Sequence, residues 1–245
     1  MIPFHREPVP FLTTDQMREV DRLMIETYRI ELIQMMEHAG RHLAHLARVR
    51  FLDGDARGKQ VVVLAGSGGN GGGVLVCARW LHNAGAAVRV HTTVDHDHFA
   101  AVPAHQLAIL QRMGVPVALA DAVTTEVAPN LIVDGIIGYS LSGAPRGMAA
   151  VLIRWANTSG APTLSLDVPS GLDATSGAVA DPAIQATATL TLALPKKGLR
   201  EPGGRRLVGE LYLADIGVPP DLYAQPSLGL SVNPIFHRSD IVRLW

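Results

Sequence analysis

The sequence predicts an α/β protein in which a mostly parallel sheet lies between two layers of helices. Short runs rich in Val, Ile, Leu and Thr alternate with longer segments of helical periodicity between residues 60 and 167. The runs are apolar throughout, which is typical of parallel strands that helices cover on both faces. The 245 residues, 48% of them hydrophobic, suffice for one large domain. We therefore expect a three-layer αβα sandwich of Rossmann-like type.

The elements are expected in a regular order. Two helices within residues 12–52 precede the sheet, and Thr13 or Thr14 before Asp15 and Gln16 resembles a capped helix start. Strands are expected at 60–65, 87–93, 131–135, 163–167, 188–193 and 211–216, with helices at 74–84, 103–113 and 149–158 between the first four. The last two strands have no evident helix between them, which indicates a short connection.

Three segments make up the chain in this prediction. Residues 1–11 form an N-terminal arm, residues 12–216 form the domain, and residues 217–245, where proline is frequent, form an irregular C-terminal tail. The arm has no continuous apolar core of the kind a secretory signal needs. Because Cys77 is the single cysteine, no internal disulfide can form. We expect a cytoplasmic protein.

The charge balance excludes two classes of partner. Twenty-one basic and 22 acidic residues give a formal net charge of -1. Such a chain exerts no broad attraction on nucleic acid or on an anionic membrane. A small molecule is therefore the expected partner.

A glycine-rich segment, GSGGNGGG at residues 66–73, follows the first strand and precedes a helix. Its bare amides and the helix N-terminus can hold a phosphate. Gly66, Gly68 and Gly71 also fit the spacing G-x-G-x-x-G, and Asp95 lies about 20 residues on, as in a conventional NAD site. The third interpretation is that the glycines only close a tight turn.

Two aspartates stand at strand ends. Asp134 ends LIVD, and Asp167 ends LSLD before Pro169 and Ser170. In an open parallel sheet the carboxyl ends of the strands border the ligand cleft. Two carboxylates there hold a cation or divide acid and base work between them. The alternative is that both only cap turns.

Three other features have competing interpretations. The cluster His91, Asp95, His96, Asp97 and His98 resembles a metal site, but side chains alternate on a strand exit, so a solvated loop is favoured. His38 lies in the cleft or in the core. Lys196 and Lys197 belong to a charged loop or contact a ligand phosphate.

Several motifs in fixed order resemble one family. They are MMEHAGR, GSGGNGGGVLVCARWL, DGIIGYSLSGAPRG, DVPSGLDATSG and LALPKKGL, within residues 12–216. Together they resemble the YjeF N-terminal domain, whose best-known activity is NAD(P)H-hydrate epimerisation. The resemblance implies a monovalent cation, usually potassium, held by Asn70, Asp134 and Ser170. The substrate contacts that it implies are Gly69, Asn70, Gly71, Gly72 and Gly73, then Gly138, Tyr139, Ser140, Leu141, Ser142, Gly143 and Ala144, and Asp167.

The glycine-rich segment departs from the family pattern. Gly69 replaces an Asn, Gly73 an Asp and Val74 a Gly, while His38 replaces an Asn and Ser140 a Gly elsewhere. The expected activity is epimerisation of NADHX or NADPHX by a homodimer, with Asp167 as general acid and base. The alternatives are a catalytically silent nucleotide-binding module, favoured by the loss of the carboxylate at Gly73, and an ordinary dehydrogenase.

Overall fold

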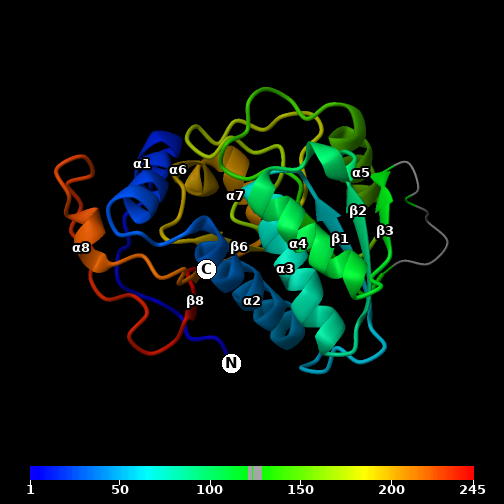
Figure 1. The fold of residues 1–245 in the computed structure, drawn as a ribbon. Coiled ribbons are helices and arrows are strands. Elements are labelled where there is room, and N and C mark those ends of the chain that lie inside the picture. The colour runs from blue at the N-terminus through cyan, green and yellow to red at the C-terminus, as the bar shows by residue number, and fades with distance from the viewer. Residues whose placement is uncertain (121–122, 124–128) are drawn as a thin grey trace.

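The structure, a computed structural model, describes residues 1–120, 123 and 129–245. Its helices are α1 (Thr14–Glu26), α2 (Leu32–Phe51), α3 (Gly69–Asn83), α4 (Ala101–Arg112), α5 (Gly147–Thr158), α6 (Lys197–Arg200), α7 (Pro202–Val208) and α8 (Pro220–Tyr223), with the 3-10 turn η1 (His96–His98) (Figure 1). Its strands are β1 (Gln60–Ala65), β2 (Ala87–Thr92), β3 (Val117–Leu119), β4 (Leu131–Gly135), β5 (Thr163–Leu166), β6 (Ala188–Leu192), β7 (Glu210–Ala214) and β8 (Ile241–Arg243).

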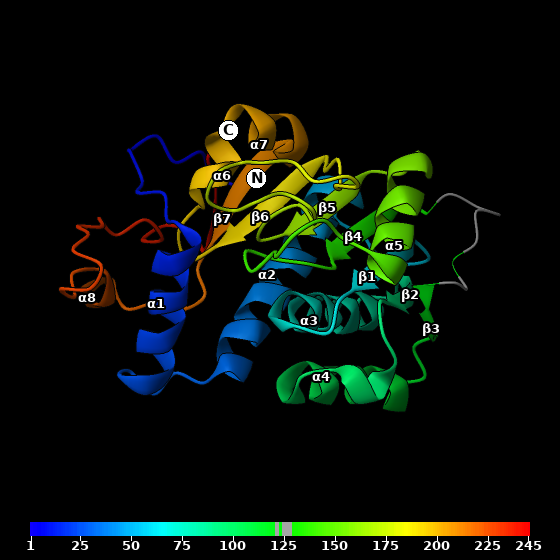
Figure 2. The same cartoon turned by 90° about the horizontal axis from the view of Figure 1, so that it is seen from above.

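These strands form one sheet in the order β3-β2-β1-β4-β5-β6-β7-β8. Every neighbouring pair is parallel except β7 and β8, which are antiparallel. Helices α2, α3 and α4 cover one face, while α5, α6 and α7 cover the other (Figure 2). The predicted three-layer, Rossmann-like α/β fold is confirmed. The strand order reverses between β1 and β4, which is where such sheets form a ligand crevice.

The long elements lie where the sequence predicts them. β1 and β4 have the predicted bounds, and the other four predicted strands agree within two residues at each end. Thr13 caps α1, because its hydroxyl accepts from the Gln16 amide at 3.2 Å and the Gln16 side chain accepts from the Thr13 amide at 3.0 Å. This reciprocal pair satisfies two backbone donors that the helix leaves free.

The prediction of a short, helix-free connection between the last two predicted strands is wrong. Helices α6 and α7 occupy this connection. Both are too short to show helical periodicity, and PGGRRLV in α7 contains two glycines, which disfavour helix by propensity. Strands β3 and β8 were also not predicted. Each has three residues, which is too few for a recognisable alternation of apolar and polar residues.

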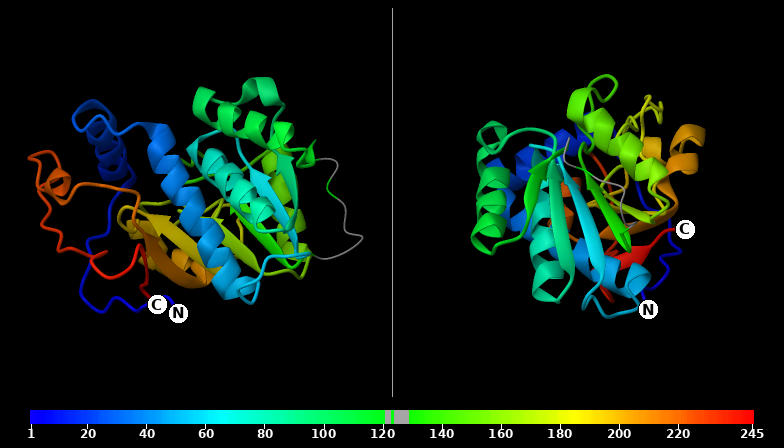
Figure 3. Two further views of the ribbon diagram at one scale, coloured as in Figure 1. Left: turned by 60° about the horizontal axis from the view of Figure 1, so that its bottom comes forward. Right: turned by 90° about the vertical axis from the view of Figure 1, so that its right-hand side faces the viewer.

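The two ends of the chain lie together at one edge of the sheet (Figure 3). The His5 amide donates to the Arg243 carbonyl at 2.9 Å, and the Arg243 amide donates to the Pro3 carbonyl at 2.8 Å. The expected arm 1–11 is therefore tied to β8 by backbone hydrogen bonds. The segment 217–245 is not irregular throughout, since it contains α8 and β8.

The glycine-rich segment begins a helix, and the predicted start of that helix at residue 74 is corrected to Gly69. Gly72 lies against α2, where an added Cβ would be 2.4 Å from Met36 Sδ. Gly40 of α2 faces α3, where an added Cβ would be 2.4 Å from Val76 Cβ. The absence of these side chains lets α2 and α3 approach closely. Among the described residues, no helix combines the length and apolar character that crossing a bilayer requires.

We predict that Gly40→Ala destabilises the fold because the new methyl group overlaps Val76 and the Gly73 carbonyl. Overpacking of this kind costs about 1–3 kcal/mol. Gly69→Ala is the matched control, since nothing lies within 4 Å of its added Cβ. Chemical denaturation should show a lower free energy of unfolding only for Gly40→Ala. Equal stability of the two variants would contradict this packing interpretation.

Candidate active site

A cavity of about 570 Å³ lies at the carboxyl ends of the central strands. Helices α1 and α2 supply a largely apolar wall, and the segments after β1, β4, β5 and β6 supply a polar one. Its volume is within the range of pockets that bind small molecules. Two carboxylic acids line it among the described residues, Asp21 from α1 and Asp167 after β5.

Asp167 forms a buried ion pair at the polar wall. Its Oδ1 accepts from the Lys196 ammonium, from Thr191 Oγ1 at 3.2 Å and from the Leu192 amide at 3.3 Å. Its Oδ2 has no hydrogen-bond partner among the described residues. Since every fully buried side-chain polar atom described has a partner, Oδ2 retains access to the cavity. One oxygen is thus fixed and the other is available to a ligand.

The backbone at Asp167 is in the left-handed region, with φ of 65°. A non-glycine residue is uncommon there, and such conformations gather at functional sites. The Asp167 amide donates to the Leu190 carbonyl of the neighbouring strand at 2.7 Å. The conformation therefore turns the chain sharply at the end of β5 while the carboxylate stays bonded to the segment after β6.

Lys196 does not belong to an exposed charged loop, so that interpretation from the sequence is wrong. The interpretation that it contacts a ligand phosphate stays a prediction, and Lys196 lines the cavity. The side chain is fully buried and its ammonium donates to Asp167, to the Leu192 carbonyl at 2.9 Å and to Thr191 Oγ1 at 3.5 Å. All three ammonium protons have protein partners. Because the ammonium is saturated, it acts on the cleft through Asp167.

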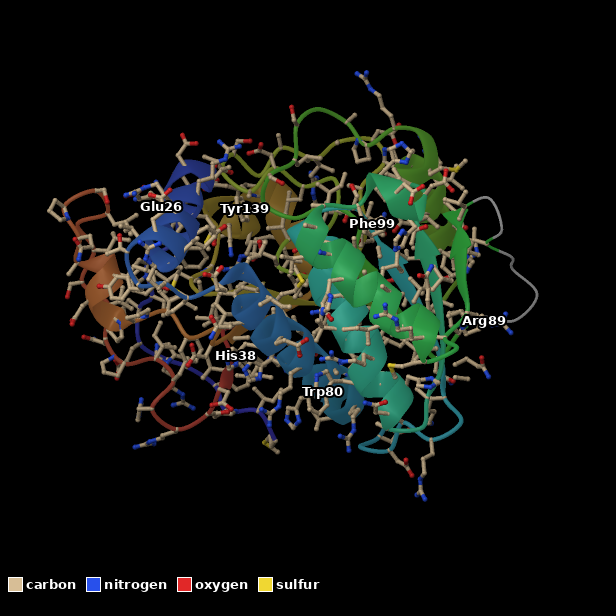
Figure 4. All side chains as sticks on the ribbon, in the orientation of Figure 1. Glu26, His38, Trp80, Arg89, Phe99 and Tyr139 are labelled. Carbon is tan, nitrogen blue, oxygen red and sulfur yellow. The ribbon has the colours of Figure 1, made fainter. Side chains whose placement is uncertain are left out.

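Asp21 was missed by sequence reasoning. The Tyr139 hydroxyl, in the turn after β4, donates a short hydrogen bond to Asp21 Oδ2, which places Tyr139 beside α1 (Figure 4). Burial raises the pKa of Asp21, and the hydrogen bond from Tyr139 offsets part of that rise. A signal was present, since Asp21 lies on the same helical face as the buried Met17 and Met24.

Asp134 and Ser170 are in direct contact beneath the cleft. Asp134 is fully buried, and its Oδ1 accepts from Ser170 Oγ at 2.6 Å and from the Ile136 amide at 3.2 Å. Its Oδ2 accepts from Ser165 Oγ at 2.8 Å and from the Ser170 amide at 3.0 Å. Burial raises the pKa of Asp134 although these four hydrogen bonds oppose the rise.

Asn70, the third predicted cation ligand, lies in the first turn of α3 and lines the cavity. Its Nδ2 donates to the Leu166 carbonyl at 2.8 Å. This bond leaves the side-chain carbonyl as the atom available to a ligand. The structure thus joins Asp134 to Ser170 and ties Asn70 to the end of β5.

The predicted substrate contacts divide into two groups. Gly69, Asn70, Gly73, Gly138, Tyr139, Ser140 and Asp167 line the cavity, whereas Gly71, Gly72, Leu141, Ser142, Gly143 and Ala144 do not. Gly71 is turned away, because its added Cβ would be 1.7 Å from the Gly66 carbonyl oxygen. Residues 142–144 are exposed outside the cavity.

The histidines singled out in the sequence lie away from the cleft. His38 is exposed and stacks on His42 with ring centroids 6.2 Å apart, so it occupies neither of its expected places (Figure 4). His91 is buried in β2, while Asp95 and η1 are exposed. Across the described ranges, no three His, Cys, Asp or Glu side chains are grouped as a metal site would need.

Comparison with known proteins relates the chain to one family. A family model described as YjeF-related protein N-terminus matches residues 32–198. An NAD(P)H-hydrate epimerase of Dehalogenimonas lykanthroporepellens is 44% identical over 95% of this chain and 92% of its own length. A bifunctional NAD(P)H-hydrate repair enzyme, Nnr, of Salinibacter ruber is 36% identical over 86% of this chain but only 41% of its own length. The crystal structure of yeast YNL200c aligns with a TM-score of 0.78 at 26% identity, covering 96% of this chain and 100% of that one.

We predict that Lys196→Met destabilises the protein because it leaves the Asp167 carboxylate buried without its cationic partner. Breaking one half of a buried pair costs about 3–5 kcal/mol. Lys197→Met is the control, since Lys197 is only half-buried and forms no ion pair among the described residues. The free energy of unfolding, measured with urea, should fall for Lys196→Met alone. Similar values for both variants would show that the ion pair contributes little.

Proposed function

The chain belongs to the YjeF-related N-terminal family, and we propose that it is an enzyme that interconverts the two epimers of hydrated NADH and NADPH. The observation that carries this proposal is the 44% identity with a NAD(P)H-hydrate epimerase over 95% of the chain. The site supports it, because a cavity of ligand size lies at the strand-order reversal. The cavity contains Asp167, one oxygen of which is unpaired among the described residues. The bifunctional relatives are longer, and only the activity of the shared region is proposed for this chain.

The reaction makes modest chemical demands. The hydrate carries a hydroxyl group on a ring carbon next to nitrogen. Loss of this group gives a planar iminium, which water can attack from either face. The departing hydroxyl needs a proton and the arriving water must lose one, so the enzyme requires a positioned acid and base more than a strong nucleophile.

Asp167 is suited to this proton transfer. Lys196, Thr191 and the Leu192 amide hold one carboxylate oxygen and so orient the other toward the cavity. The apolar wall from α1 and α2 limits the water around the ring. The amides at the start of α3 are available to a substrate phosphate.

We also propose that Asn70, Asp134 and Ser170 hold a monovalent cation, for which potassium is the family's usual choice. The donors are oxygens, as a hard cation prefers. Asp134 is fully buried, and among the described residues no cationic side chain pairs with it. A bound potassium ion would supply the missing positive charge and keep the turn after β4 in place.

The second candidate is a catalytically silent nucleotide-binding module. Gly73 favours it, because the family pattern places an aspartate there. In this chain a Cβ at residue 73 would be 2.5 Å from Leu166 Cδ2, so the Leu166 side chain would have to shift to admit that carboxylate. Asp167, Asp134 and Ser170 are all present, which favours the enzyme.

The compartment and assembly of the protein are further parts of the proposal. Burial raises the pKa of the Cys77 thiol, so the single cysteine is unreactive and suits a reducing cytosol. A homodimer is the expected assembly, because twofold dimers are the commonest soluble oligomers.

The decisive assay follows the conversion of an NADHX epimer mixture to NADH by an S-specific dehydratase. The dehydratase alone leaves the R epimer to react at the slow spontaneous rate. We expect this chain to remove that slow phase, because a positioned acid or base accelerates proton transfer by roughly 10²–10⁴-fold. Asp167→Asn, which preserves shape but not the proton, is the matched control. An unchanged slow phase with NADHX and NADPHX, potassium present, would favour the binding module.

Potassium should raise the melting temperature above that in lithium at equal ionic strength. At ten times its dissociation constant, a ligand stabilises the native state by about 1.4 kcal/mol, or roughly 3–6 °C for a chain of this size. Asp134→Asn should abolish the difference between the salts, while Asp15→Asn, exposed on α1, should preserve it. The cation proposal fails if wild-type protein melts at the same temperature in both salts.

A further inference from the structure

Inversion at a ring carbon places two demands on the cavity, on opposite sides of the ring. The hydroxyl leaves one face with a proton that an acid supplies. Water then attacks the other face and loses a proton to a base. A carboxyl fixed at one side of a planar ring reaches only the face turned toward it. A single positioned Asp167 therefore accounts for one half of the inversion.

The cavity holds a second carboxyl on its other wall. Asp21 projects from α1, whereas Asp167 follows β5, and these are the two acidic side chains lining the cavity in the described part of the chain. Each has one oxygen engaged, by Tyr139 for Asp21 and by Lys196 for Asp167. The other oxygen of each is unpaired among the described residues and retains access to the cavity. The two carboxyls thus present one free oxygen each to the same space.

The two carboxyls have different surroundings. Lys196 and two further donors surround Asp167 Oδ1, so this carboxyl has a cationic partner and a fixed orientation. Among the described residues, no cationic side chain is bonded to Asp21. Burial raises the pKa of Asp21, an effect that the charge of Asp167 reinforces and that Tyr139 and Lys196 oppose. Two carboxyls in such different surroundings, on opposite walls of one cavity, are suited to serve as acid and base.

We propose that Asp21 is a second catalytic carboxyl, which transfers a proton at the ring face opposite to the face that Asp167 serves. The inference rests on the proposed epimerase function. In one direction the Asp21 carboxyl gives its proton to the departing hydroxyl oxygen as the carbon–oxygen bond breaks, releasing water and an iminium. Water then bonds to the other face of that carbon and gives a proton to the Asp167 carboxylate.

Protons balance over these two steps. One proton leaves Asp21, one reaches Asp167, and the hydrate ends as the other epimer with no net gain or loss of electrons. The protein is left with Asp167 protonated and Asp21 ionised, which is the state needed for the reverse direction. Exchange of one proton with solvent restores the starting state. No oxidant, reductant or further reactant is needed.

Tyr139 is a positioning residue in this scheme. Its hydroxyl donates to Asp21 Oδ2, so the tyrosine fixes one oxygen and leaves Oδ1 for the substrate. Thr14, at the start of the same helix, donates through its hydroxyl to the Tyr139 carbonyl at 3.4 Å, and its amide donates to Thr175 Oγ1 at 2.8 Å. These bonds hold α1 against the turns after β4 and β5, and so hold Asp21 at the cleft.

The test compares epimerisation with oxygen exchange in H₂¹⁸O, using purified full-length protein and each NADHX epimer separately. In Asp21→Asn the amide oxygen can still accept from Tyr139, but the side chain no longer supplies a proton. We expect kcat for epimerisation to fall by about 10²–10⁴-fold, with KM within about threefold of wild type. ¹⁸O should still enter one epimer without inversion, because Asp167 can release and return water on its own face.

Asp167→Asn should also lose epimerisation. In this variant ¹⁸O should enter only the epimer that exchanges no ¹⁸O in Asp21→Asn. Asp15→Asn is the matched control, since this aspartate is on the same helix but exposed and paired with Arg18 at 3.0 Å. It should epimerise at the wild-type rate. If Asp21→Asn lowers the melting temperature, the equally sized pair Asp21→Glu and Asp21→Gln replaces it, and only the glutamate should retain activity.

Two outcomes would overturn the inference. The first is near-normal epimerisation by Asp21→Asn. The second is that Asp21→Asn loses epimerisation and also loses ¹⁸O exchange with both epimers, which would indicate a structural role for Asp21 or a single catalytic carboxyl. A wild-type protein without epimerase activity is a different result, because it would refute the proposed function itself. Wild-type activity together with an unaffected Asp21→Asn variant would refute this inference alone.

Discussion

The buried ion pair between Lys196 and Asp167 joins the parts of the molecule that form the cleft. Asp167 ends β5, and Lys196 follows β6. The segment around Lys196 also holds the start of the chain, since the Leu12 amide donates to the Pro195 carbonyl and the Lys197 amide donates to the Leu12 carbonyl, both at 2.8 Å. Helix α1 begins two residues after Leu12. The same short segment thus orients the carboxylate on one wall and anchors the helix that carries Asp21 on the other.

A second constraint is the close approach of α2 to α3. Gly40 and Gly72 have no side chain at the points where a Cβ would overlap the other helix. This approach brings Met35 and Met36 of α2 to the cavity that Asn70 also lines. The glycines after β1 therefore have two roles. Gly68 and Gly69 border the cavity with free space around them, whereas Gly71 and Gly72 allow close packing.

The polar side of the site has two layers. Asp134 and Ser170 lie in the lower, fully buried layer, where they bond to each other and to the backbone after β4. Asp167, Asp21 and Tyr139 lie above it and line the cavity. The lower layer thus bonds to the turn after β4, while the side chains of the upper layer face the cavity. Asp134 and Ser170, which are proposed to hold a cation, and the residues proposed to transfer protons thus lie in separate layers.

The sequence by itself determined the α/β class, the long elements and the strand-end position of Asp167. Continuous apolar runs rich in β-branched residues, such as that of β1, are typical of buried parallel strands, so local pattern and tertiary structure agree there. Strands β3 and β8 and helices α6 and α7 are too short for periodicity to reveal them. Only the tertiary structure decided that Lys196 is buried and that Asp21 reaches the cleft. Both depend on partners far away in the chain, Asp167 and Tyr139, and a local pattern carries no information about contacts of that kind.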